Sequence, residues 1–556
     1  MDDRERLALL TAPGGGFPLV RRSVGGVALE VFDRDPRTLR EAFLATRRHA
    51  DREAIVYRDD RYTYADQWSI VVTLAHRLRD KLGVVKGDRV AIAMRNYPEF
   101  AFTFWAAQLL GAVAVPLNAW LKAAEMTDLI RETAPKALFA DRERVEQLRG
   151  VDGVGALVGV RCTEAPLDYT DLLDLDHPLD TPPACDVDPD DVATILYTSG
   201  TTGRPKGAPG THLNHAASLL NKLIRAVSPP DRPGGKPLPP APSVKLLTFP
   251  FFHIAGINNL YSNAYSGHRT VLMYKWDAPE ALRLVEAERV GEMSGPPFVV
   301  QTFLAAAATS ERDLSSLRSL GMGGAPAPKA LIQEIHEIFG GRVSPRTGYG
   351  LTETTSGVFA ISGADFVAHP DSVGRPLPTV EVRIEDGTGH AVPAGAEGEV
   401  ALRGPQVVAG YYRTASEDNF LDGWFRTGDL GRLDADGYLY LVGRLKDVVI
   451  RGGENINCAE VEACLATHPD VVEAVVFGLP HPTLGEELGA IVRLRTGSTT
   501  DAASLRAYAA ERLAAFKVPA KLAISPIPIP RTPSGKIIKR HVAAALDFDR
   551  LLTDTV

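Results

Sequence analysis

Residues 194–208 read TILYTSGTTGRPKGA, an apolar strand that runs into a loop of hydroxyl residues, glycines and one lysine. Glycines let backbone amides approach a polyanion, hydroxyls donate to phosphate oxygens, and Lys206 adds positive charge. The segment therefore predicts a phosphate-binding loop rather than a mobile surface turn. It differs from the P-loop, because Pro205 rather than glycine precedes the lysine and Gly207 follows it. The predicted phosphate-binding residues are Thr198, Ser199, Gly200, Thr201, Thr202, Gly203 and Lys206.

The sequence around this loop alternates β-branched clusters with Ala- and Leu-rich helical stretches, as in RVAIAM (89–94), AFTFWAAQLL (101–110) and VAVPL (113–117). This alternation predicts βαβ units and parallel sheets flanked by helices. The stretch 100–117 approaches the length of a membrane span, but Gln108, Gly111 and Pro116 interrupt it. We expect a buried helix that leads into a core strand, and no transmembrane segment.

Beyond about Ser372 the pattern changes to shorter strands with Gly and Asp turns, which predicts an antiparallel or barrel-like module. After GRLKD (443–447) a self-contained order of strand, helix, two strands and helix predicts a compact α+β unit. The fold class is therefore α/β. We expect a large N-terminal domain of two flanked, mostly parallel sheets with a small β-barrel-like subdomain, and a small α+β C-terminal domain.

Composition excludes several classes of protein. The 556 residues carry 61 Lys and Arg against 69 Asp and Glu, a net charge of −8. This balance argues against nucleic acid or an anionic membrane surface as partner. Four cysteines without CxxC or Cys/His spacing predict neither a disulfide framework nor a zinc site. The N-terminus does not have the pattern of a secretory signal, so a cytoplasmic location is expected.

Six further segments accompany TSGTTGRPKG in order: PFFHIAG (250–256), GYGLTET (348–354), GEVALRGPQVVAGYY (398–412), RTGDLG (426–431), GRLKDVVIRGGENI (443–456) and PRTPSGKI (530–537). In this set the chain resembles the superfamily of adenylate-forming enzymes, which includes acyl-CoA synthetases, nonribosomal adenylation domains and beetle luciferases. The resemblance covers about residues 40 to 545.

The resemblance implies roles for residues of the large domain. Tyr349 would stack on adenine, Thr352 would bond the α-phosphate, and Glu353 would bind Mg²⁺ through a hard oxygen ligand. Gly324, Ala325 and Pro326 would form a wall against which adenine or the acyl chain packs. Asp429 would accept hydrogen bonds from the ribose hydroxyls, and Arg444 would contact ribose and phosphate.

The resemblance also implies a mobile C-terminal domain. Lys446 would be the pivot of the hinge 444–447, between an N-terminal domain of residues 1–443 and a C-terminal domain of residues 448–556. Lys536 would stabilise the charge that develops during adenylation, as an electrostatic catalyst. Gly452 and Gly453 would line the pantetheine channel during thioester formation.

His253 would gate the acyl tunnel. Amino-acid-activating relatives place an aspartate at this position, so His253 argues against an α-amino acid substrate. Because Ile254, Ala255, Ile257 and the segment 294–301 supply no acidic group, we expect an apolar tail on the carboxylic acid. Fatty, aromatic and polycyclic terpenoid or steroid side-chain acids all remain open.

The prediction is therefore an acyl-CoA synthetase, an acid:CoA ligase that uses ATP, Mg²⁺ and CoA and forms an acyl adenylate. The alternative is an acyl-AMP ligase that loads a separate carrier protein. A luciferase-like monooxygenase shares the motifs, and a non-catalytic nucleotide-binding protein would lack Lys536, Glu353 and Asp429, which are present. The oligomeric state, a homodimer included, stays open.

Overall fold

The computed structural model describes residues 3–198, 205–227, 243–414, 419–451, 454–531, 537 and 539–554. The chain divides into two compact units. Unit 1 comprises Met1–Glu381 and Leu402–Phe425, and unit 2 comprises Val382–Ala401 and Arg426–Val556. This division groups residues 426–443 with the C-terminal part of the chain, whereas the predicted hinge at 444–447 stays a prediction.

The first sheet of unit 1 has seven strands in the order β11-β10-β6-β5-β7-β8-β9. Their bounds are β5 Arg89–Ala93, β6 Val113–Pro116, β7 Ala137–Asp141, β8 Ala156–Val160, β9 Leu167–Asp168, β10 Val192–Thr198 and β11 Lys206–Thr211. All neighbours pair in parallel except β10 and β11, which are antiparallel. The predicted parallel βαβ arrangement is therefore confirmed.

The second sheet of unit 1 contains the path β18-β17-β16-β15-β14-β12-β13-β3-β4. The bounds are β3 Glu53–Tyr57, β4 Asp60–Thr63, β12 Val244–Leu247, β13 Arg269–Leu272, β14 Glu292–Gly295, β15 Ser319–Met322, β16 Ser344–Leu351, β17 Ser356–Ser362 and β18 Ser372–Pro376. The strands from β16 to β3 pair in parallel. Their carboxyl ends therefore share one edge, where ligands bind in open α/β sheets.

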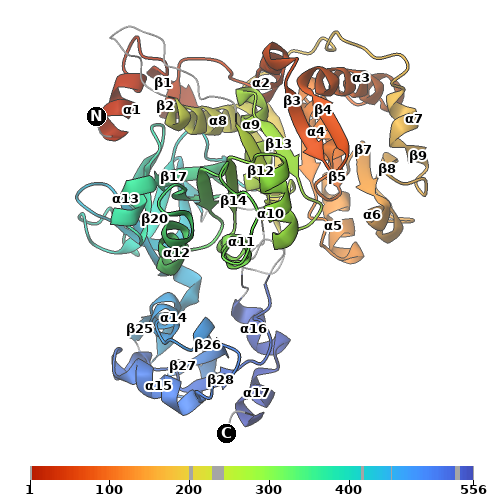
Figure 1. Cartoon of the computed structure of the whole chain (residues 1–556). Helices are drawn as coiled ribbons and strands as arrows, with labels where there is room; N and C mark the ends of the chain where they lie inside the picture. Colours follow the sequence, from red (N-terminus) through yellow and green to blue (C-terminus); the bar gives the residue numbers. More distant parts are fainter. Residues whose placement is uncertain are drawn as a thin grey trace. The chain divides into compact units, whose positions relative to one another are not determined.

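Helices surround both sheets (Figure 1). Their bounds in unit 1 are α1 Asp3–Thr11, α2 Leu39–Leu44, α3 Tyr64–Leu82, α4 Pro98–Leu109, α5 Ala123–Thr133, α6 Arg142–Gln147, α7 Tyr169–Leu173, α8 His212–Ala226, α9 Ile254–Ser266, α10 Ala278–Ala287, α11 Pro297–Ala307, α12 Lys329–Phe339 and α13 Gly363–Ala368. A separate hairpin pairs β1 Leu19–Val24 with β2 Val27–Phe32.

Helix α4 and strand β6 account for the apolar stretch 100–117. Every residue from Phe100 to Leu109 is buried, and β6 is buried along its whole length. The prediction of a core helix followed by a core strand is thus confirmed. Across the described ranges, none of the helices combines the length and the apolarity that crossing a membrane requires.

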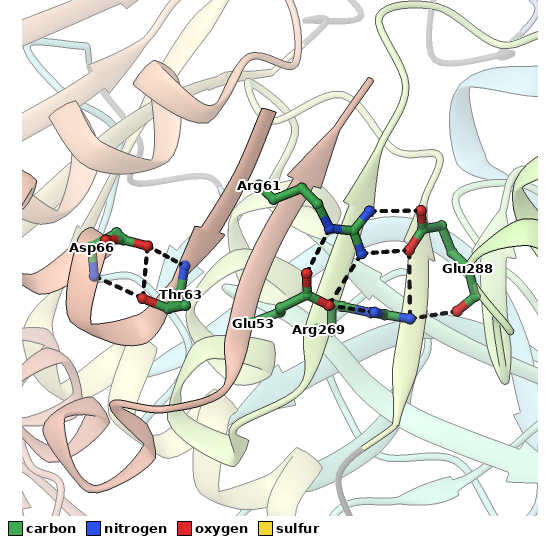
Figure 2. Close-up of polar contacts among 6 residues, drawn as sticks. All are labelled: Glu53, Arg61, Thr63, Asp66, Arg269 and Glu288. Carbon is green, nitrogen blue, oxygen red and sulfur yellow. Dashed lines mark hydrogen bonds and ion pairs between the residues drawn. The ribbon is translucent and has the colours of Figure 1, made fainter. Parts of the chain in front are cut away.

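An ion-pair network ties the end strands of the second sheet together (Figure 2). Arg61 on β4 lies 2.6 Å from Glu53 on β3 and 3.0 Å from Glu288, which follows α10. Arg269 on β13 contacts the same two residues. Hydrogen bonds from Arg61 lower the pKa of Glu53 to about 2, so its carboxylate stays charged. Figure 2 also shows the capping box of Thr63 and Asp66 that begins α3.

Unit 2 contains most of an antiparallel module followed by the α+β part. The module has the strand order β19-β20-β22-β23, and the next sheet has the order β25-β24-β27-β26, with β28 beside β27. The bounds are β19 Glu381–Glu385, β20 Gly398–Arg403, β22 Trp424–Leu433, β23 Leu439–Arg444, β24 Val448–Arg451, β25 Glu454–Asn457, α14 Cys458–Ala466, β26 Val471–His481, β27 Gly485–Leu494, α15 Ala502–Ala510, β28 Lys521–Ile524, α16 Lys539–Ala545 and α17 Phe548–Asp554. The short strand β21 Phe420–Leu421 pairs with the start of β22.

Candidate active site

The carboxyl edge of the second sheet brings several predicted residues together. Strand β12 leads to His253, which is the N-cap residue of α9, and β15 leads directly to the Gly324–Pro326 turn. Strand β16 contains Tyr349, whose side chain is 8% exposed, and leads to Thr352 and Glu353. The predicted residues at this edge are His253, Gly324, Ala325, Pro326, Tyr349, Thr352 and Glu353.

Asn96, which follows β5, fixes the turn before His253. Its amide nitrogen donates to the Phe249 carbonyl at 3.0 Å, and its Oδ1 accepts from the Phe251 amide at 2.8 Å. A Cβ at Gly256 would lie only 2.1 Å from the Pro250 carbonyl oxygen. The glycine of PFFHIAG is thus required by the close approach of α9 to this turn.

The turn that carries Glu353 is held by hydrogen bonds between the Thr354 side chain and the backbone. The Thr354 hydroxyl donates to the Ser356 carbonyl at 2.8 Å and accepts from the Leu351 amide at 2.8 Å. Ser356 has φ +91°, a left-handed conformation that is costly for a residue other than glycine. A Cβ at Gly350 would lie 2.0 Å from the Ser356 carbonyl oxygen. The close β16–β17 hairpin therefore fixes the position of Glu353.

Tyr411 links Glu353 to the lysine of the phosphate loop. Glu353 is 93% buried, and the Tyr411 hydroxyl donates to its Oε1 at 2.8 Å. The ammonium of Lys206 lies 4.6 Å from the centre of the Tyr411 ring, within cation–π range. Burial and the charge of Glu353 raise the pKa of Tyr411 well above its usual value, so the hydroxyl remains a donor.

Backbone hydrogen bonds hold the segment around Tyr411 against both motifs. The Val408 amide donates to the Glu353 carbonyl at 2.9 Å, and the Tyr412 amide donates to the Gly207 carbonyl at 2.8 Å. Tyr411 lies in the segment GEVALRGPQVVAGYY (398–412), but no role was predicted for it. The two adjacent tyrosines of GYY could have drawn attention to this segment. The residues that Tyr411 contacts, however, cannot be inferred from a single sequence.

The phosphate loop itself is described only at its ends. Thr198 closes β10 and Lys206 opens β11, and the two residues are paired across the strands. The predicted Ser199, Gly200, Thr201, Thr202 and Gly203 lie outside the described residues. The register nevertheless brings the chain back on itself between Thr198 and Lys206, as a phosphate-binding loop requires.

Unit 2 holds the other predicted nucleotide residues. Asp429 on β22 and Arg444 on β23 are directly paired, and the Arg444 Nε lies 2.7 Å from the Asp429 carboxylate. Asp429 is 96% buried. Lys446 lies in the 3₁₀ turn Leu445–Asp447 that follows. The predicted Gly452, Gly453 and Lys536 lie outside the described residues.

The donor set fits Mg²⁺ bound together with a phosphate ligand. Within the described ranges, no three His, Cys, Asp or Glu side chains gather as a ready-made metal cage. Mg²⁺ commonly uses one or two carboxylates and completes its shell with water and substrate phosphates. Glu353, a rigidly held carboxylate close to the phosphate-loop lysine, meets that requirement.

Two models of known protein families match the chain. The model described as "AMP-binding enzyme" matches residues 43–412, and the model described as "AMP-binding enzyme C-terminal domain" matches residues 460–536. The chain belongs to the AMP-binding enzyme family. The expected family and the expected fold class are therefore confirmed.

Named relatives of this AMP-binding enzyme are CoA ligases. The chain is 36% identical over 483 residues to the feruloyl-CoA synthase of Amycolatopsis sp., covering 86% of the chain and 93% of the relative. It is 34% identical over 499 residues to the 2-succinylbenzoate–CoA ligase of Bacillus licheniformis, covering 88% and 96%. The predicted enzyme class, an AMP-forming acid:CoA ligase, is confirmed.

A solved structure of similar fold is the O-succinylbenzoate coenzyme A synthetase of Bacillus subtilis in complex with ATP and magnesium ion. The TM-score is 0.76 at 29% identity, and the match covers 90% of this chain and 98% of that chain. ATP with Mg²⁺, and CoA as the acceptor, are the cosubstrates of this enzyme class, as predicted.

Proposed function

We propose that the protein activates a carboxylic acid with ATP and transfers the acyl group to CoA. The carboxylate oxygen attacks the α-phosphorus, the bond to pyrophosphate breaks, and an acyl adenylate forms. The CoA thiolate then attacks the acyl carbonyl, and AMP leaves. The Lys206–Tyr411–Glu353 cluster carries this proposal, because it joins a phosphate-loop cation to a buried carboxylate at the ligand-binding edge.

Each residue at this edge contacts a different part of ATP. Tyr349 stacks on adenine, Thr352 donates to the α-phosphate, and Lys206 attracts the phosphate oxygens. Glu353 holds Mg²⁺, which when bound neutralises phosphate charge. The Tyr411 hydroxyl positions the Glu353 carboxylate by donating to one of its oxygens, so Tyr411 is a positioning residue.

Asp429 and Arg444 serve the ribose. An ion-paired carboxylate still has lone pairs that can accept hydrogen bonds from the two ribose hydroxyls. Arg444 holds the Asp429 carboxylate in place across the β22–β23 ladder. Both residues precede the proposed pivot Lys446 and the proposed mobile domain 448–556.

The two half-reactions divide between two segments of the C-terminal domain. Lys536 stabilises the developing charge at the α-phosphate during adenylation. The Gly452–Gly453 segment replaces it during thioester formation and admits the pantetheine arm. Strands β24 and β25 pair on either side of this segment, with Arg451 opposite Glu454.

The acid that fits the sequence has an apolar body. Ile254 and Ile257 are buried beside His253, and the relatives are named for feruloyl and 2-succinylbenzoate, both aryl acids. We therefore favour an aryl acid or an acid of similar length over a long polycyclic one. Loading of a separate carrier protein is the alternative acceptor reaction.

The decisive experiment measures AMP formation by the purified full chain with ATP, Mg²⁺ and a panel of aryl and fatty acids. CoA and a phosphopantetheinylated carrier protein are compared as acceptors. We expect AMP with CoA and at least one acid. Absence of AMP across the panel would refute the ligase proposal, and turnover with the carrier alone would favour the alternative.

Lys536→Ala separates the half-reactions. We expect it to reduce ATP–pyrophosphate exchange by about 100-fold or more, because it removes electrostatic stabilisation of the adenylation transition state. Thioester formation from supplied acyl adenylate should stay within about threefold of wild type. Equal loss in both assays would contradict the proposed division of roles. Lys521→Ala, on β28 of the same unit, is the matched control.

A further inference from the structure

Helices α8 and α9 pack against each other, and a lysine lies in the seam between them. The Lys222 ammonium on α8 donates to Asn259 Oδ1 and Ser262 Oγ on α9, each at 2.7 Å, and to Asn258 Oδ1 at 3.3 Å. Apolar side chains usually fill such a seam. This seam instead holds an ammonium surrounded by neutral oxygens.

The polar groups continue along the seam beyond the lysine. The Asn258 amide nitrogen donates to Ser218 Oγ on α8 at 2.9 Å and to the Tyr261 hydroxyl at 2.7 Å. The Ser262 hydroxyl donates to the Asn258 carbonyl at 2.6 Å, which leaves its oxygen to accept from Lys222. These hydrogen bonds fix the amides that surround the ammonium, so the cluster is a built site.

The ammonium has no anionic partner in the part of the chain that the structure describes: no carboxylate there lies within 4.0 Å of it. The charged groups that act electrostatically on Lys222 are Lys245 on β12, Glu292 on β14 and Arg346 on β16. Glu292 is already paired with Lys245 at 2.9 Å and with Arg346 at 3.5 Å. The region therefore has a positive excess, and burial lowers the pKa of Lys222 to about 7.

The polar cluster around Lys222 lies at a defined distance along α9 from the active-site edge. Helix α9 begins at that edge, directly after His253. At 1.5 Å per residue, Asn259 and Ser262 lie roughly 9 and 14 Å along the helix from His253. Lys222 and Asn259 both keep partial exposure although they face a helix–helix contact. Beside the edge, a Cβ at Gly324 would meet open space.

We propose that Lys222, with Asn259 and Ser262, binds an anionic oxygen group at the far end of the acid substrate. This inference rests on the proposed function, because it places the reacting carboxylate at the edge and the distal group beside α9. It refines the expectation of a wholly apolar tail. The substrate class becomes an acid with an apolar body and a second carboxylate or a phenolate oxygen at its other end.

The test uses matched acids that differ only at the distal end. Cinnamate is compared with 4-carboxycinnamate and 4-hydroxycinnamate, and decanoate with decanedioate. Calorimetry measures binding to the full chain, and ATP–pyrophosphate exchange measures activation. We expect 4-carboxycinnamate or decanedioate to exceed its unsubstituted partner by about tenfold in affinity and in kcat/KM. If 4-hydroxycinnamate alone shows the preference, the distal group is a phenolate oxygen rather than a carboxylate.

Variants test whether Lys222 causes the preference. Lys222→Met should reduce the ratio within each pair to about one, and Asn259→Asp should do the same by supplying Lys222 with an internal anion. Lys245→Met, which removes a neighbouring charge without touching the amides, should keep the ratio within about twofold. Thermal unfolding of each variant verifies that it is folded. If Lys222→Met does not fold, Asn259→Asp still tests the role of Lys222.

The outcomes separate the two proposals. A wild-type preference for the unsubstituted acids, or a preference that survives both Lys222→Met and Asn259→Asp, overturns the inference and leaves the ligase proposal intact. Selective binding of the distal anion without exchange for any acid supports the site and refutes the ligase proposal.

Discussion

Two buried carboxylates, one in each unit, are held in opposite ways. Glu353 in unit 1 accepts a hydrogen bond from a neutral tyrosine hydroxyl, whereas Asp429 in unit 2 is ion-paired with the guanidinium of Arg444. A neutral donor orients a carboxylate and leaves its charge in place, while a guanidinium cancels the charge and keeps lone pairs available. The first arrangement suits a cationic ligand and the second suits neutral hydroxyl groups.

The largest expected effect comes from removing the charge of Glu353. Glu353→Gln keeps the volume and an acceptor for Tyr411 but cannot hold Mg²⁺ well. We expect ATP–pyrophosphate exchange to fall by about 100- to 1,000-fold, with partial recovery at high Mg²⁺. Metal titration of the exchange rate measures this.

The control for that variant is a carboxylate of similar burial with no place in the proposed site. Glu385 in unit 2 is 99% buried and paired with Arg383 and Arg426. Glu385→Gln should lower the melting temperature, since it breaks a buried ion pair, without changing the Mg²⁺ dependence. Equal changes in both variants would show that burial, and not position, explains the result.

A smaller effect is expected for Asp429→Asn. The amide still accepts a hydrogen bond, but it loses the charge-assisted contact with Arg444 and half of its acceptor capacity. We expect KM for ATP to rise about 10- to 100-fold, with a smaller change in kcat. Because the ribose role requires a hydroxyl donor, wild type should prefer ATP to 2′-deoxy-ATP. In Asp429→Asn this preference should disappear. An unchanged preference for ATP would contradict that role.

The smallest effect is expected for Tyr411→Phe, which keeps the ring beside Lys206 and removes only the hydroxyl. A five- to tenfold loss of kcat/KM is expected, about the net worth of one hydrogen bond to a charged group. Burial and the charge of Glu353 raise the pKa of Tyr411, so the hydroxyl stays protonated where an ordinary tyrosine begins to ionise. The alkaline limb of the pH–rate profile should therefore be the same in wild type and variant; a limb that moves would show that Tyr411 titrates.

Local sequence pattern was sufficient for most of the fold. The β-branched clusters predict the strands, and periodicity and length predict the helix of residues 98–109. Parallel pairing of the strands then places Tyr349, Glu353 and His253 at one edge of the sheet. The contact between Tyr411 and Glu353 could not be predicted in this way, because 58 residues separate them.

The seam of α8 and α9 shows a different limit. Ile254, Ala255 and Ile257 suggested an apolar acyl pocket because they adjoin His253 in sequence. At 3.6 residues per turn, however, Asn258, Asn259 and Ser262 lie together on one side of α9. That polar stripe was present in the sequence, but the lysine that it surrounds comes from another helix, 37 residues before Asn259.

The ion pairs of Figure 2 also affect how the protein behaves at high concentration. Strand β4 is the last strand of its sheet, and such an edge offers unpaired backbone groups to a strand of another chain. On β4, Asp60 is paired with Arg161 and Arg61 with Glu53 and Glu288. A second chain that added a strand there would have to bury or separate these charges. The contacts that fasten β4 to its own sheet therefore protect this edge against intermolecular β-sheet growth.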